Sequence, residues 1–151
     1  MASVVKTQDR RHFQIVERWH EVTITHADLT DADTSQAIDL ATDDNGNAFP
    51  VDCQIVGAFI RVDTDFSGGS VSALTCQVGD AGDPDELITA TSVFTGASNV
   101  KPLSANGAAG LPRWEAAYAP EALFTSTTDN LVNLTAGSLT IGLRLWVVEL
   151  F

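Results

Sequence analysis

The sequence predicts an all-β fold: an antiparallel β-sandwich that is jelly-roll-like, with one short helix and a long loop of small residues. Apolar residues recur at every second position in several short runs, which is typical of half-buried strands. Clusters of Gly, Asp, Asn and Pro separate these runs at the spacing of sandwiches and jelly rolls. The chain of 151 residues can bury one core. We expect about seven to nine strands in a single domain over 12–151, after a basic N-terminal arm at 1–11.

The first expected strand is His12–Thr25, and its apolar residues change phase partway along. Phe13 and Ile15 share one parity. Val22 and Ile24 share the other parity. Because a phase slip inside one strand usually marks a bulge or a bend between two sheets, we expect such an irregularity here.

The middle of the chain predicts a buried strand and a returning partner. Cys53–Thr64 is apolar on both parities at its centre, which is typical of a strand covered on both faces. The sequence FSGGS at 66–70 predicts a turn, and with it a hairpin to a strand at Val71–Val78. The other expected elements are strands at 36–41, 114–118 and 123–128, and turns at 43–50 and 135–138.

The final strand has the most regular alternation of the chain. Apolar side chains fall on every second residue from 139 to 147, so this face is expected in the core. The opposite face carries Arg144, Trp146 and Val148, and it is expected to meet a second sheet, a neighbouring subunit or a larger surface. Phe151 is expected to be buried there as well, with a gain of about 2 kcal/mol.

One short helix and one long loop are expected between these strands. Asp83 can cap a helix that has Pro84 at its first position, and Glu86 completes the spacing of a capping box. The β-branched residues that follow limit this helix, at 83–93, to about two turns. Residues 95–113 are poor in large side chains, and a loop of that length tends to be functional or ordered by a partner. We interpret it as an arm or an interface loop.

Charge is the strongest compositional signal. The chain has a formal net charge of −12, yet residues 1–20 hold four basic against two acidic side chains, a net charge of +2. The rest holds four basic against eighteen acidic side chains, a net charge of −14. An acidic body repels phosphates, so nucleic-acid binding is not expected. The basic arm, with Lys6, Arg10 and Arg11, suggests contact with an acidic neighbour; a solvated terminus is the alternative.

The sequence predicts neither membrane insertion nor secretion. No run approaches the about 20 apolar residues that span a bilayer, and no apolar segment follows the basic N-terminus. The chain is therefore expected to be made in the cytoplasm and to leave it, if at all, by a route other than secretion. In that compartment Cys53 and Cys76 are expected to be reduced apolar side chains, with a late disulfide as the alternative.

Patterns that would predict catalysis or a metal site are missing or weak. The sequence has no GxSxG elbow, Walker loop or GxGxxG. His12, His20 and His26 would lie roughly 20–27 Å apart along an extended strand, too far for one ion. The acidic loop at 80–86 offers oxygen ligands to calcium without the EF-hand spacing, so calcium there stays open. We expect no enzyme activity, no cofactor and no metal.

The tryptophans suggest a surface for binding. Trp19, Trp114 and Trp146 could form a platform for carbohydrate, as in a lectin-like module. Tryptophans in strands are more often half-buried core or interface anchors. We therefore expect an interface, with a carbohydrate-binding β-sandwich as the alternative.

Three stretches are similar to a known family. Val78-Gly79-Asp80 closes an expected strand, Asp83–Thr91 is the capped turn, and Thr135-Ala136-Gly137 precedes the final strand, so the likeness spans 78–148. In these stretches the chain resembles small structural proteins of tailed bacteriophages that are described as head decoration, or cement, proteins. The resemblance implies a jelly-roll-like sandwich bound to the outer surface of a capsid, often as a trimer.

The resemblance also implies partners and a location. The expected partners are the major capsid protein and further copies of this chain, and the expected location is the virion after synthesis in the host cytoplasm. A phage tail or fibre component is the alternative within the virion. The expected interface residues are Lys6, Arg10, Arg11, Trp114, Arg144, Trp146 and Phe151.

Overall fold

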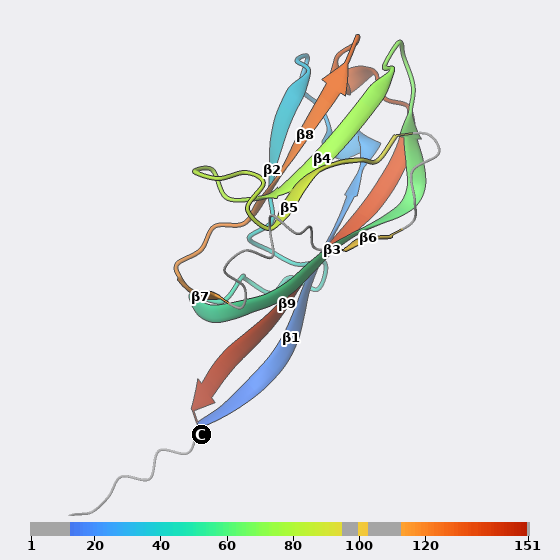
Figure 1. Ribbon diagram of the computed structural model, residues 1–151. Helices are drawn as coiled ribbons and strands as arrows, with labels where there is room; N and C mark the ends of the chain where they lie inside the picture. The colour runs from blue at the N-terminus through green and yellow to red at the C-terminus, as the bar shows by residue number, and fades with distance from the viewer. Residues whose placement is uncertain (1–12, 95–99, 103–112, 151) are drawn as a thin grey trace, which may run out of the picture.

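The protein forms two antiparallel β-sheets that pack face to face (Figure 1). The structure, a computed structural model, describes residues 13–94, 100–102 and 113–150, and the statements below concern these residues. The predicted all-β sandwich is confirmed. Its described elements are, in order, β1 (Phe13–Thr25), the 3₁₀ helix η1 (His26–Asp28), β2 (Ser35–Asp39), β3 (Asp52–Ser67), β4 (Ala73–Gly79), β5 (Ile88–Ser92), β6 (Val100–Pro102), β7 (Arg113–Ala116), β8 (Glu121–Thr127), the 3₁₀ helix η2 (Leu131–Asn133) and β9 (Ala136–Leu150).

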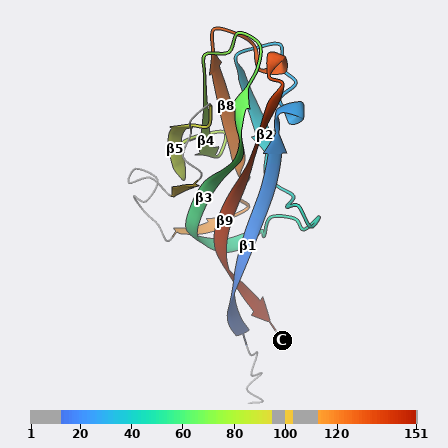
Figure 2. The same cartoon turned by 90° about the vertical axis from the view of Figure 1, so that its right-hand side faces the viewer.

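The strands pair in a nested order. One sheet has the order β1-β9-β3-β6, with β7 also paired to β3, and the other has the order β2-β8-β4-β5. The first strand therefore pairs with the last, β2 with β8, β3 with β6 and β4 with β5, each antiparallel. The chain wraps around the sandwich so that consecutive strands often lie in opposite sheets (Figure 2). No helix in the described ranges is long and apolar enough to cross a membrane.

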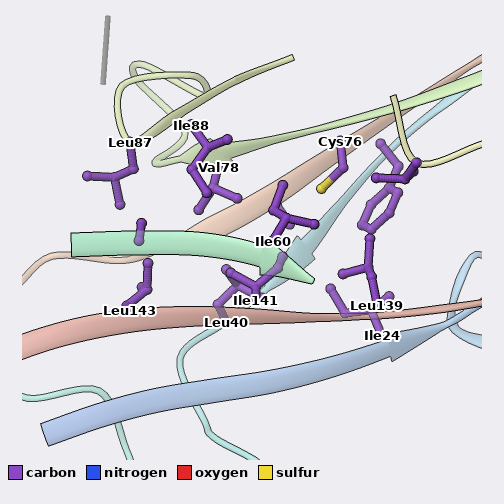
Figure 3. Close-up of a cluster of buried hydrophobic side chains, with 14 of the residues drawn as sticks. Ile24, Leu40, Ile60, Cys76, Val78, Leu87, Ile88, Leu139, Ile141 and Leu143 are labelled. Carbon is purple, nitrogen blue, oxygen red and sulfur yellow. The ribbon is translucent and has the colours of Figure 1, made fainter. Parts of the chain in front are cut away.

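The core lies between the inner faces of the two sheets. Figure 3 shows side chains of the four-stranded sheet, such as Val78 and Ile88, meeting those of the five-stranded sheet, such as Ile60 and Ile141. Burying one large apolar side chain contributes about 1.5–3 kcal/mol. The predicted inward face of the last strand is confirmed: Leu139, Ile141, Leu143 and Leu145 are buried, and Val147 is half-buried against the core.

The predicted irregularity in β1 is wrong. β1 pairs with β9 over its whole length without a register shift. The paired ends of the two strands, where Phe13 meets Leu150, project beyond the rest of the described chain (Figures 1 and 2). No second sheet covers this end, so its apolar residues do not mark a core face. The apparent phase slip between Ile15 and Val22 is a change from an uncovered segment to a covered one.

The bulge occurs instead in β3. The pairing of β3 with β9 shifts register between Ile55 and Gly57. Because one residue is added there, Ile55 and Ala58 both point into the core although their parities differ. Buried residues of both parities therefore lie on one covered face. No second layer covers the other face in the described chain: Phe59 is only half-buried there and Arg61 is exposed, so the prediction of two covered faces is wrong.

The predicted hairpin after β3 is also wrong, although its turn is present. Gly68 and Gly69 have φ values of +135° and +55°, which side chains other than glycine rarely adopt. The chain leaves this turn for the other sheet, where β4 pairs with β5 and β8. Next to the turn, β9 lies on one side of β3, and on the other side Phe66 forms a parallel bridge with Phe94, so β4 does not pair there.

The predicted helix at 83–93 is replaced by a turn and a strand. The cap is Asp80, whose Oδ1 accepts hydrogen bonds from the backbone N–H groups of Gly82 and Asp83, both at 2.8 Å. The following residues form β5, and Leu87 and Ile88 are buried in the core. β-branched residues favour a strand, and the adjacent β4 completes the hydrogen bonds that a helix would have made internally.

The turn predicted at 135–138 lies inside β9, which begins at Ala136. Gly137 has a φ of +133°, and an added Cβ would lie 2.4 Å from the ring of Phe66. The glycine thus serves a close approach to a core aromatic ring and does not reverse the chain. The expected loop at 95–113 contains β6 and the first residue of β7; its other residues lie outside the described ranges.

Candidate interaction surface

The side of the five-stranded sheet that faces away from the core carries large apolar side chains. In an antiparallel pair, residues directly opposite each other point to the same face. β1 and β9 alternate between the two faces, and the partners of core residues such as Ile24 and Leu139 point inward. The pairs on the outward face include Ile15 with Val148, Glu17 with Trp146, and Trp19 with Arg144.

Trp19, Phe59 and Trp146, together with Ile15 and Val148, form what we call the aromatic face. The rings of Trp19 and Phe59 lie 5.5 Å apart at an angle of 59°. Trp146 Nε1 donates a hydrogen bond of 3.4 Å to Glu17, and this holds its indole beside β1. Four of these side chains are well exposed: Ile15 at 61%, Trp19 at 47%, Val148 at 41% and Trp146 at 38%. Contiguous apolar surface of this kind marks a binding site in soluble proteins.

Glycine makes room for the aromatic face at the centre of the sheet. Gly142 in β9 is paired with Phe59, and an added Cβ at Gly142 would lie 2.2 Å from the Phe59 ring. The ring therefore lies over the glycine, which brings it to within packing distance of Trp19. Any side chain at this position would displace the ring from the sheet.

Arg144 lies within this face and has an unsatisfied polar atom. Its Nε is buried and has no hydrogen-bond partner within the described part of the chain. Gly57 is the register partner of Arg144, and an added Cβ there would lie at an ordinary contact distance of 3.6 Å from Nε. A buried donor on a charged group is costly when it lacks an acceptor. Arg144 is thus prepared for an acceptor that the described chain does not supply.

A second basic residue on this side is already paired. Arg61 Nε donates to Asp63 at 2.7 Å, and Thr140 Oγ1 donates to the same carboxylate at 2.8 Å. Burial alone would raise the pKa of Asp63, but the hydrogen bonds from Arg61 and Thr140 outweigh burial and hold this pKa below its usual value. Arg61 is therefore used within the sheet, unlike Arg144.

Basic residues are confined to one sheet in the described strands. The four strands β2, β4, β5 and β8 contain no Lys or Arg, and their only charged residues are Asp39 and Glu121. The strands of the five-stranded sheet contain all the described basic residues: Arg18, Arg61, Lys101, Arg113 and Arg144.

The structure brings some of the predicted interface residues together. Arg144 and Trp146 lie on the same outward face of β9. Trp114 in β7 is paired with Gln54, and Gln54 is paired on its other side with Trp146, so the backbone register aligns the three positions in one row. The remaining predicted residues, Lys6, Arg10, Arg11 and Phe151, lie outside the described ranges, and the burial of Phe151 stays a prediction.

Sequence reasoning missed Ile15 and Phe59 as interface residues, and it left Trp19 out of the named interface residues although it considered the three tryptophans as core or interface anchors. The parity of each strand was visible, and Ile15 shares its parity with Trp19. The missing information was the register, which sets Ile15 opposite Val148 and Phe59 opposite Gly142. The sequence did show which residues of the last strand face outward. Residues of neighbouring strands that lie opposite these positions share the same face, and this could have pointed to Ile15 and Phe59.

The free edge of β1 is partly sealed. Asp44 accepts hydrogen bonds from Thr23, at 2.8 Å from the backbone N–H and 2.7 Å from the hydroxyl, and its own N–H donates to Glu21 O at 2.9 Å. Groups that point away from β9 recur at every second residue of β1. At Ile15, Glu17 and Trp19 these groups have no backbone partner in the described residues. The edge is thus closed at Glu21 and Thr23, and it is open from Ile15 to Trp19.

A polar hollow of about 390 Å³ lies beside β1, under the loop at 43–50. The Asp43 carboxylate is used within this loop, where it accepts bonds from Asn45 N at 3.0 Å and Asn47 N at 2.7 Å. The bond from Asn47 lowers the pKa of Asp43. His20 is buried with its Nε2 2.6 Å from Leu40 O, so it has a structural partner. These contacts close a loop and leave few groups for a ligand.

The remaining candidate sites have structural roles. A hydrogen bond with Asp85 and the surrounding acids raise the pKa of Asp83 in the acidic loop. Within the described ranges, no three His, Cys, Asp or Glu side chains are grouped to hold a metal ion. Cys53 and Cys76 are both buried and no disulfide joins them, so the alternative of a disulfide is wrong. They belong to strands of opposite sheets, β3 and β4.

Comparison with known proteins gives evidence about the fold. No protein-family model matches the chain, and no curated protein matches it. Among solved structures, the chain is similar to one from the "Cyanophage Pam1 capsid asymmetric unit". The TM-score is 0.61 at 16% sequence identity, and the match covers 88% of this chain and 86% of that chain. At this identity the similarity shows a shared fold.

Proposed function

We propose that this chain is a non-enzymatic structural protein of a bacteriophage virion, a decoration or cement protein that binds the outer surface of the capsid and stabilises it. The observation that carries the proposal is the fold shared with a chain of the cyanophage Pam1 capsid asymmetric unit. The match covers nearly equal shares of the two chains, so the two are of similar length. The support therefore concerns the whole sandwich and not a small part of it.

One strand end adds support from the sequence. β4 ends at Gly79, so Val78-Gly79-Asp80 closes a strand as expected, whereas Ala136 and Gly137 lie at the start of β9 and not before it. The third stretch, Asp83–Thr91, forms a turn followed by a strand.

The surface of the protein is suited to a structural role that depends on stable binding to a partner. A rigid two-sheet body presents the aromatic face, in which Arg144 Nε has no acceptor among the described residues, and the sequence supplies basic residues at 1–11. One such contact of modest area binds weakly, but linked copies raise the effective concentration of each other's contacts. The partners we propose are the major capsid protein and other copies of this chain, with a trimer favoured. The proposed location is the virion, after synthesis in the host cytoplasm, with no nucleic-acid or membrane partner.

Reconstitution on capsids tests the proposal. Purified protein is added to shells assembled from the major capsid protein, and co-sedimentation and the heat resistance of the shells are measured. We expect saturable binding and shells that open at a higher temperature. A variant with Lys6, Arg10 and Arg11 changed to Gln is expected to bind more weakly, with a smaller dependence on salt. Absence of co-sedimentation at every salt concentration, with unchanged heat resistance, would contradict the proposal.

Carbohydrate binding is the second candidate, because Trp19 and Trp146 are exposed on the same flat face. Aromatic rings on a sheet can stack against sugar rings. The test is titration of tryptophan fluorescence across a glycan panel, with Trp146→Ala as the control variant. A saturable change that is lost in this variant would favour the second candidate over the first.

A further inference from the structure

We propose that copies of this chain associate through the aromatic face, so that the five-stranded sheets meet inside the assembly and the four-stranded sheets stay in solvent. The occupant of the face is a second copy of this chain. This inference deepens the proposed function and rests on its self-association, because it assigns that association to one surface. It follows from the chemistry of the two outer faces, from charge and from Arg144.

The two outer faces differ in what they offer a partner. The aromatic face presents two exposed tryptophans and two exposed aliphatic side chains at neighbouring register positions. Tryptophan is the residue most enriched among those that dominate binding energy at protein interfaces. The outward positions of the four-stranded sheet instead hold small or polar residues: Ser35, Ala37, Asp39, Ala73, Thr75, Gln77, Glu121, Thr125 and Thr127, with Leu123 half-buried among them.

Charge determines where two copies of an acidic protein can meet. Each chain has a net charge of −12, so most orientations of two copies bring negative surfaces together. On the outward side of β1, β3 and β9 the carboxylates of Glu17, Glu21, Asp52 and Asp63 lie among the guanidinium groups of Arg61 and Arg144, and these six side chains sum to a charge of −2. The outward positions of the four-stranded sheet also carry −2, from Asp39 and Glu121, but they hold no basic residue. The aromatic face is therefore the sheet face on which an acid of one copy can meet a base of the other.

Arg144 identifies the chemistry that must cover this face. Arg144 is half-buried and its Nε has no acceptor in the described chain, so a carboxylate on a covering surface that pairs with the accessible nitrogens of the same guanidinium would offset part of the cost of burying this charge. The same face carries such carboxylates at Glu17 and Glu21, each two residues from Trp19, the register partner of Arg144. When two copies of this face meet, the carboxylates of each copy can therefore pair with Arg144 of the other. A partner other than this chain would need to reproduce that mixture of charges and apolar residues.

Two valine substitutions make a matched test in the purified protein. Val148→Lys places a charge on the aromatic face, and Val132→Lys places the same charge in η2, at the opposite end of the sandwich. The two valines are 41% and 47% exposed, so the substitutions are similar in kind and in exposure. Sedimentation velocity over a concentration series measures the association of each variant. We expect Val148→Lys to weaken association about 30-fold or more, and Val132→Lys to leave it unchanged.

Trp19→Lys serves as an independent variant on the same face, and circular dichroism confirms that each variant is folded. Two results would overturn the inference. One is a wild-type protein that stays monomeric at all concentrations. The other is association that survives Val148→Lys and Trp19→Lys in folded protein, including the case in which these variants lose only shell or glycan binding. Since no capsid is present in this experiment, its outcome is separate from that of the shell-binding test.

Discussion

The five-stranded sheet turns Trp19 and Trp146 outward, whereas the largest apolar residue at the outward positions of the four-stranded sheet is Leu123. Both sheets obey the same alternation, and both bury Leu, Ile, Val and Phe on their inner faces. The inner faces are interchangeable in chemistry because they share one core. The outer faces do not contact each other, so packing does not require them to be alike. Their difference therefore indicates which face binds a partner.

The inner faces should respond equally to truncation, and this is the largest effect that we expect. Phe66 of β3 and Phe124 of β8 are fully buried and meet across the core, with ring centroids 6.1 Å apart. Phe66→Ala and Phe124→Ala should each lower the free energy of unfolding by about 3–5 kcal/mol. Unfolding in denaturant measures both losses. A loss below about 1 kcal/mol for one of them would show that the sheets do not share one core equally.

The outer faces should respond unequally to an added side chain. Gly142→Val pushes two methyl groups into the position of the Phe59 ring, and we expect a loss of about 1–3 kcal/mol together with a changed fluorescence of Trp19. Ala37→Val on the outward side of β2 is the control, and it should change stability by less than about 0.5 kcal/mol. Equal losses of stability in the two variants would show that the two outer faces do not differ in how tightly their side chains are packed.

The edge of β1 allows a smaller test, because Asp44 seals only part of it. Asp44→Ala removes the two side-chain bonds to Thr23, and we expect a loss of about 1 kcal/mol. The newly opened edge should also make the protein more prone to form large aggregates, which light scattering detects. Unchanged scattering at equal concentration would indicate that pairing along this edge is unimportant for association. Asp43→Ala, whose bonds stay inside the loop, is the comparison.

Acid should weaken the sandwich without changing the contrast between the faces. Asp129 has a lowered pKa because its carboxylate accepts hydrogen bonds from Ser70 N, Asn133 and Asn130 N. A lowered folded pKa means that its stabilisation is complete above the ordinary value of 3.8 and is lost as pH falls through the lowered value. Urea unfolding between about pH 5 and pH 2 should show this loss in the wild type and less of it in Asp129→Asn. A parallel decline in both proteins would assign the acid sensitivity to other groups.

The parts of the fold that sequence could predict are those in which a covered face imposes strict alternation. The inward face of β9 is such a case, since every second residue from Leu139 to Leu145 is buried. The prediction failed where alternation has another cause. The start of β1 has no covering sheet, and β3 contains a bulge, so parity reports burial correctly in neither segment.

Long-range pairing explains the other errors. A helix was predicted at 83–93 because capping residues precede it, but β4 offers the segment an adjacent strand, and burial of Leu87 and Ile88 favours that pairing. The hairpin after β3 was predicted from its glycine turn, yet β4 pairs with β5 and β8 in the other sheet, and the end of β3 meets Phe94 instead. Local signals located the turns correctly and could not reveal which strands lie side by side.

The candidate site was partly visible for the same reason. Arg144 and Trp146 follow from the exposed parity of the last strand alone. Phe59 comes from a strand more than 80 positions earlier, and only the register places it against Gly142. The unsatisfied Nε of Arg144 is a property of packing, which no pattern of residue types records.

The pairing of Phe13 with Leu150 has a practical outcome for labelling. Phe13 and Leu150 lie side by side at one tip, so a gold label attached at either of these two positions would mark the same spot in an electron micrograph. A cargo attached at 131–133 would mark the far pole of the protein. Comparing the two labels on a particle would therefore give the orientation of the subunit directly.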